Sequence, residues 1–140
     1  MKVVLDTNCL LQIIFPKSKY KDVWVALIRQ KYRICLTNEI LMEYREIIER
    51  RFKDIQFAEA VIEAIIALPN TEFVNPSYRF NLIKADPDDN KFVDCAVTAG
   101  ATYIVSNDKH FDELKEYDFP KVDVRTLSEF FDIVKGLQTN

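Results

Sequence analysis

Short apolar segments of strand length alternate along the chain with longer segments whose apolar residues recur every three or four positions. The short segments are residues 2–5, 33–36, 72–74, 103–105 and 122–124. The longer segments, which this spacing predicts to be helices, are residues 8–15, 20–30, 38–52, 56–68, 89–100 and 128–137. The alternation predicts a three-layer α/β/α fold, with a mainly parallel central sheet of about five strands and helices on both faces.

Residues that typically begin or end helices support these boundaries. Thr37 is a typical N-cap ahead of the third long segment. The acids within residues 86–89 suit the first turn of the helix that follows them, because the helix dipole favours negative charge there. Gly100 is a plausible C-cap for that helix. Residues 75–88 are the longest stretch without a regular pattern, and loops of this length often carry function.

The composition is that of an ordinary globular protein, with 49% hydrophobic and 29% charged residues. No linker or repeat divides the chain, so we expect one domain, residues 1–140. No apolar run approaches the roughly 18 to 20 residues of a membrane span, and Asp6 interrupts the apolar start where a signal peptide would continue. We therefore expect a cytoplasmic protein with no membrane partner. Cys9, Cys35 and Cys95 are scattered, which favours buried apolar side chains over disulfides or a zinc site.

The net charge of −3 gives no overall signal for nucleic-acid binding. Two basic segments, residues 17–21 and 50–53, can nevertheless contact a phosphate backbone. Each of them is equally well explained as a solvated loop or helix end, so neither decides the function alone.

Four acids that are far apart in the sequence fall where sites form in parallel sheets. Asp6 comes directly after one predicted strand and Asp108 follows another by three residues, and Glu43 and Asp89 lie in the early turns of helices. In open α/β sheets such positions gather outside the carboxyl ends of the strands. Two carboxylates about 5 Å apart repel by roughly 3 kcal/mol at an effective dielectric of 20. A cluster of acids therefore favours a hard divalent cation, Mg²⁺ or Mn²⁺.

Each acid also has a structural interpretation. Asp6 can be the N-cap of the next helix, Glu43 can face solvent, and Asp108 can be a turn residue. The acids of residues 86–89 can cap their own helix, and at least one is expected to do so. Only the joint placement of the acids favours a metal site over these alternatives.

The third acid of the cluster is the least determined. Asp86 or Asp88 can replace Asp89, because the three acids crowd one turn. Asp94 lies five residues after Asp89, about 140° further round a helix, which makes a peripheral or water-mediated role the better expectation.

Other hydrolytic and nucleotide-dependent chemistries fit poorly. The chain has two glycines, Gly100 and Gly136, so neither a phosphate-binding P-loop nor a dinucleotide fingerprint can form. His110 is the single histidine, so a Ser-His-Asp mechanism would depend on it. We expect His110 to have a surface or helix-start role instead, and the alternative is that it contacts RNA or assists a leaving group.

Four segments in this order resemble the PIN-domain family of metal-dependent ribonucleases. They are "VVLDTNCLL", "LTNEILMEYREII", "DPDDNKFVDCAVTAGATYIVSNDKHF" and "VDVRTLSEFFDIV". The resemblance spans nearly the whole chain and is greatest to the VapC-like toxins of type II toxin–antitoxin pairs. It implies a PIN-like fold, RNA as substrate, a cognate antitoxin as partner and a homodimer.

The resemblance also assigns residues. It implies that Asp6, Glu43, Asp89 and Asp108 are catalytic and hold Mg²⁺ or Mn²⁺, and that they promote hydrolysis of RNA phosphodiester bonds. Three further residues, Asn8, Ser106 and Asp94, are expected to orient ligands, water or substrate from a second layer. The alternative hypothesis is a non-catalytic PIN fold that binds RNA or a protein without cutting.

Overall fold

The central sheet is built from short strands, of which the middle three are mostly buried. The computed structural model describes residues 1–118 and 120–138, and within them five strands pair in the order β3-β2-β1-β4-β5. The strands are β1 (Lys2–Leu5), β2 (Arg33–Leu36), β3 (Thr71–Phe73), β4 (Tyr103–Val105) and β5 (Val124–Arg125). Every pairing is parallel, and β1 lies at the centre between β2 and β4. The predicted parallel sheet of about five strands is confirmed.

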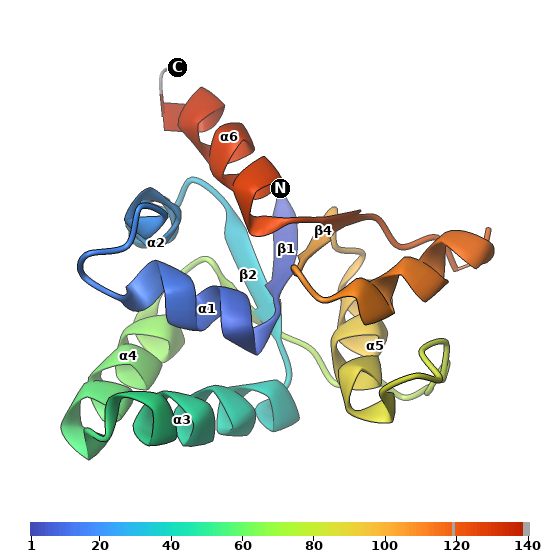
Figure 1. The fold of residues 1–140 in the computed structure, drawn as a ribbon, viewed down its shortest axis with the longest axis horizontal. Helices are drawn as coiled ribbons and strands as arrows, with labels where there is room; N and C mark the ends of the chain where they lie inside the picture. Colours follow the sequence, from blue (N-terminus) through green and yellow to red (C-terminus); the bar gives the residue numbers. More distant parts are fainter. Residues whose placement is uncertain (119, 139–140) are drawn as a thin grey trace.

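Helices cover both faces of this sheet, which confirms the three-layer α/β/α architecture (Figure 1). The helices are α1 (Thr7–Ile14), α2 (Lys21–Ile28), α3 (Asn38–Phe52), α4 (Ile55–Ala67), α5 (Asn90–Ala99) and α6 (Leu127–Gln138), with 3₁₀ helices η1 (Pro87–Asp89) and η2 (Lys109–Glu116). The connections between strands place α1 and α2 on one side of the sheet and α5 on the other (Figure 1). The segments that follow the strands therefore lie around the edge of the sheet at which the strands end.

Several predicted helix boundaries are confirmed by the caps that the structure shows. The Thr37 side chain accepts a hydrogen bond from the Ile40 backbone N–H at 3.1 Å, which fixes the start of α3. Gly100 ends α5 with φ of 64°, a left-handed conformation that glycine adopts without steric cost.

The remaining boundaries differ from the predictions by a few residues. α2 ends at Ile28 rather than residue 30, and Gln30 has a positive φ of 61°. The last strand is β5 at Val124–Arg125 rather than residues 122–124. The 3₁₀ helix η2 was not predicted, because its apolar positions, Phe111 and Leu114, are too few to make a helical pattern.

A buried aromatic side chain, Tyr44, connects α3 to the central strand β1. Tyr44 is fully buried, and its hydroxyl donates a hydrogen bond to the Leu5 carbonyl at 2.5 Å. This bond joins α3 to the end of β1, so Glu43, one residue earlier, is held near Asp6. The cysteines are free and buried among the described residues, as predicted. No described helix is long and apolar enough to cross a membrane.

Candidate active site

Asp6 is the innermost acid of the site. It occupies the N-cap position of α1, yet within the described residues its carboxylate makes no capping hydrogen bond. Instead, the Ser106 hydroxyl donates to Asp6 Oδ2 at 2.7 Å. The side chain is nearly buried, and this burial, with the nearby charges of Asp108 and Glu43, raises the pKa of Asp6 above its usual value. The Asn8 backbone N–H, at the start of α1, and the Ser106 hydroxyl both favour the charged form of Asp6, but burial and the neighbouring acids outweigh them.

Ser106 joins the first acid to the last. Its Oγ donates to Asp6 and also accepts a hydrogen bond from the Asp108 backbone N–H at 3.0 Å. Ser106 is itself buried at the end of β4, next to β1 in the sheet. Asp108 begins η2, where its Oδ1 accepts a hydrogen bond from the His110 backbone N–H at 2.9 Å. Neighbouring parallel strands thus deliver Asp6 and Asp108 to one edge.

The three acids before α5 have different positions. Asp86 caps η1 by accepting a hydrogen bond from the Asp88 backbone N–H at 3.2 Å, and Asp88 is exposed. Asp89 is turned inward, and its Oδ2 is buried without a hydrogen-bond partner in the described part of the chain. Burial and the charges of Asp86, Asp108 and Asp6 raise the pKa of Asp89 to about 7. Of the three, Asp89 has the environment expected of a carboxylate that interacts with a cation.

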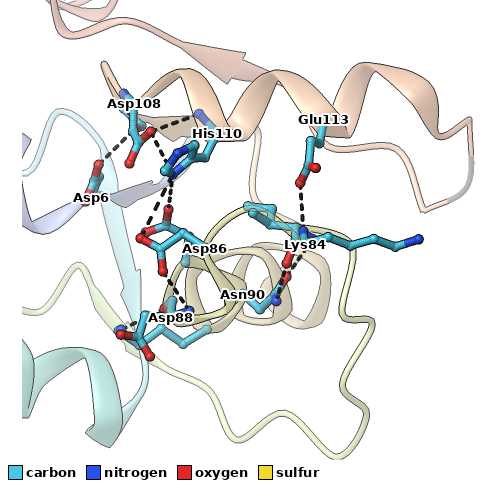
Figure 2. Close-up of polar contacts among 12 residues, drawn as sticks. Asp6, Lys84, Asp86, Asp88, Asn90, Asp108, His110 and Glu113 are labelled. Carbon is cyan, nitrogen blue, oxygen red and sulfur yellow. Dashed lines mark hydrogen bonds and ion pairs between the residues drawn. The ribbon is translucent and has the colours of Figure 1, made fainter.

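His110 lies among these acids, where the sequence had favoured a surface or helix-start role. Its Nδ1 is 3.3 Å from Asp108 Oδ1, 3.6 Å from Asp89 Oδ2 and 4.0 Å from Asp86 Oδ2. Figure 2 shows the imidazole between Asp108 above and Asp86 below. His110 is in the first turn of η2, and its side chain is 44% exposed, which agrees with the expected position at the start of a helix. Its contact with the acids was not predicted.

Glu43 approaches the cluster from α3 and already has two partners. The Thr7 hydroxyl donates to Glu43 Oε2, and Lys91 Nζ forms an ion pair with Glu43 Oε1 at 2.8 Å. The Lys91 side chain is only 11% exposed, and its Nζ also donates to the Asp88 carbonyl at 2.8 Å. Neither Thr7 nor Lys91 was predicted to lie at the site. The position of Thr7 directly after Asp6 is weak evidence for a place in the site. No feature of the sequence around Lys91 indicates that it lies there.

The expected second-layer residues separate into two groups. Ser106 contacts the acids directly, as described above, and Asn8 is exposed and lines the cavity beside Asp6. The structure does not bring Asp94 to the acids. Its carboxylate accepts a hydrogen bond from the Phe80 backbone N–H at 3.0 Å, and its charged neighbours are Arg79 and Glu39.

Asp94 and Asn90 instead hold the long loop before η1. The Asn90 side chain is buried, accepts a hydrogen bond from the Ile83 N–H and donates to the Ile83 carbonyl, both at 2.9 Å. The Lys84 N–H donates to Glu113 at 2.8 Å (Figure 2). These hydrogen bonds hold the loop against α5 and η2. They thereby determine where the chain enters η1, and so the positions of Asp86 and Asp89.

The donor set suits a hard divalent cation. Carboxylate oxygens predominate, and Asp86, Asp89 and His110 each offer one ligand atom within 4.8 Å of the others. The unpartnered Asp89 Oδ2 and the raised pKa values of Asp6 and Asp89 indicate negative charge that the protein alone does not neutralise. A cation would supply that neutralisation.

Comparison with known proteins agrees with this geometry. No curated protein matches the chain. The family model described as "PIN domain" matches residues 2–110, which include Asp6, Glu43, Asp89 and Asp108. PIN domains are generally metal-dependent nucleases, and their fold is a nuclease fold. With 109 of its 140 residues matched, and with a parallel sheet whose carboxyl edge gathers the acids, the chain belongs to the PIN domain family.

Proposed function

We propose that residues 1–140 form a single PIN domain that cuts RNA as a metal-dependent endoribonuclease. Asp6, Glu43, Asp89 and Asp108 are the catalytic acids and hold Mg²⁺ or Mn²⁺. The observation that carries the proposal is the buried Asp89 oxygen, which has no hydrogen-bond partner among the described residues and lies within the electrostatic field of the other acids. A structural carboxylate would be expected to have a partner in the protein.

The proposed chemistry is hydrolysis of a phosphodiester bond. A bound Mg²⁺ or Mn²⁺ would lower the pKa of an attacking water and neutralise charge that develops on the phosphate. The protein's part is to hold the acids in place. Ser106 fixes the orientation of Asp6 through the 2.7 Å hydrogen bond, and Asn8 lines the adjoining cavity, from where its amide can orient substrate or water. Asp94 acts at a distance, through the loop that it anchors.

We further propose that the protein is the VapC-like toxin of a type II toxin–antitoxin pair, acts in the cytoplasm, forms a homodimer and is blocked by a cognate antitoxin. The support for these points is the resemblance of the four sequence segments. A gene for a small DNA-binding protein immediately upstream, and co-purification of its product with this chain, would be the expected result. Purification as a monomer that no neighbouring gene product binds would contradict this part of the proposal and leave the nuclease intact.

The experiment that tests the nuclease compares wild type with Asp6→Asn on a mixed pool of RNA. We expect cleavage that requires Mg²⁺ or Mn²⁺, that stops with EDTA, and that falls at least about 100-fold in the variant, because even outer residues of metal sites typically contribute 10- to 100-fold. The matched control is Asp112→Asn, an acid on η2 whose side chain is 67% exposed, which should cut normally. Thermal unfolding of each variant checks that it is folded.

A non-catalytic RNA- or protein-binding module is the competing function. Binding of RNA by wild type and Asp6→Asn alike, with no metal-dependent cleavage by either, would support the module and refute the nuclease.

A further inference from the structure

A cavity of about 950 Å³ opens directly beside two of the acids. Asp6 and Asp108 line one end of it, and the opposite end is formed by the connection between α1 and α2 and by the C-terminal end of α3. In Figure 1 these segments lie together on the side of the molecule where α1, α2 and α3 pack. Its volume is at the upper end of the roughly 300 to 1,000 Å³ typical of small-ligand sites, which is room for a nucleotide.

Aromatic rings form part of the cavity wall. The rings of Phe15 and Phe52 lie nearly parallel, with centroids 6.3 Å apart and planes 21° apart. Phe15 is 47% exposed, although it is a large apolar side chain. Because an exposed aromatic ring on the wall of an open cavity is the arrangement on which unpaired bases stack, Phe15 has the properties of a base platform.

Positive charge gathers at the end of the cavity away from the acids. Lys17 and Lys19 come from the connection between α1 and α2, and Arg51 comes from the last turn of α3. The two basic segments, residues 17–21 and 50–53, were undecided from sequence alone and now contribute side chains to one cavity. In a chain of net charge −3, this cluster is complementary to a polyanion.

We propose that this cavity binds one or two nucleotides of single-stranded RNA next to the bond that is cut. The base stacks on Phe15, Lys17, Lys19 and Arg51 contact phosphates, and the chain leads the scissile phosphate to Asp6 and Asp108. This inference rests on the proposed function for the identity of the nucleic acid. It assigns the side chains that hold an unpaired nucleotide, because only an unpaired base can leave its neighbours and stack on a protein side chain.

The test measures binding of a fluorescein-labelled single-stranded RNA of about 12 nucleotides, within the site sizes of single-strand binders. Fluorescence anisotropy is recorded in Mg²⁺, with every protein carrying Asp6→Asn to prevent cleavage. Arg51→Gln is compared with Arg50→Gln, the neighbouring arginine that lines a different surface and pairs with Glu46. Phe15→Ala is compared with Phe15→Tyr, which keeps the ring, and with Tyr78→Ala, a 64% exposed aromatic elsewhere.

We expect three results. Arg51→Gln weakens binding and lowers the slope of log K against log salt by about 0.7, the value for one phosphate contact on a single strand, whereas Arg50→Gln does neither. Phe15→Ala weakens binding about fivefold or more, the lower limit for loss of one stacked base, and Phe15→Tyr restores it. The same sequence as a duplex binds more weakly and is insensitive to Phe15→Ala.

Opposite outcomes overturn the inference. Equal binding and equal salt slopes for Arg51→Gln and Arg50→Gln would refute the phosphate contact of Arg51. Because Arg51 is exposed, its replacement should not disturb folding. An equal effect of Phe15→Ala on the binding of duplex and of single-stranded RNA would refute the stacking of a base on Phe15. The two proposals fail separately. Cleavage that persists while the cavity variants bind like their controls refutes the cavity alone, and the predicted binding pattern without any cleavage refutes the nuclease alone.

Discussion

Replacing Asp89 with asparagine should stabilise the metal-free protein at alkaline pH. The pKa of Asp89 is raised from the usual 3.8 to about 7, chiefly by burial and then by the charges of Asp86, Asp108 and Asp6. The folded state therefore keeps a proton that the unfolded state has released, so the free energy of unfolding falls as pH rises from about 4 to about 7. Above pH 7 the penalty is complete. The asparagine side chain carries no charge and would avoid this penalty.

The size of the effect follows from the same shift. A rise of about 3 pKa units corresponds to a ceiling of about 4 kcal/mol at 1.36 kcal/mol per unit. Solvent screening and relaxation reduce such a ceiling, so we expect a gain of about 1–2 kcal/mol at pH 8. By the linkage relation, the gain should be smaller at pH 5 than at pH 8.

Urea unfolding in EDTA, followed by the fluorescence of the single tryptophan, Trp24, measures this gain. The control is Asp88→Asn, which removes the adjacent but exposed acid and should change stability little. Saturating Mg²⁺ should reverse the order of stability, because wild type gains RT ln(1 + [L]/Kd) and Asp89→Asn binds the ion more weakly. A metal-free Asp89→Asn protein no more stable than wild type at pH 8, or an equal gain from Asp88→Asn, would refute the reasoning.

Three further substitutions test how the acids are held. Ser106→Ala, which removes a buried hydroxyl with two hydrogen bonds, should lower stability by about 1–2 kcal/mol and lower kcat more than it raises KM in RNA cleavage; unchanged kcat would contradict a positioning role. Asn90→Ala breaks both bonds to Ile83 and should cost about 2–3 kcal/mol, with faster hydrogen exchange confined to residues 80–89. Lys91→Gln removes the cation beside Glu43 and should tighten Mn²⁺ binding about threefold or more by calorimetry, because like charges repel; weaker binding would show that Lys91 supports the ion.

Most of the fold could be predicted from local sequence. Strands such as Lys2–Leu5 are recognisable because a strand buried on both faces needs a continuous apolar run. Helices such as Asn38–Phe52 show a periodic apolar face and a capping threonine. Their alternation then leaves few arrangements other than a parallel sheet. The errors lie where these signals are short, as in η2 and β5.

The sequence by itself determined that Asp6 and Asp108 reach one edge of the sheet, because all strands of a parallel sheet have their carboxyl ends at the same edge. That β1 and β4 are neighbours was decided by the tertiary structure. Only the tertiary structure decided the partners of those acids. The pairing of Lys91 with Glu43 depends on how α5 packs near α3, and the position of His110 depends on where η2 meets η1. The packing of two helices depends on side chains along their whole length. The local sequence around a residue therefore does not predict which residue of another helix it will contact.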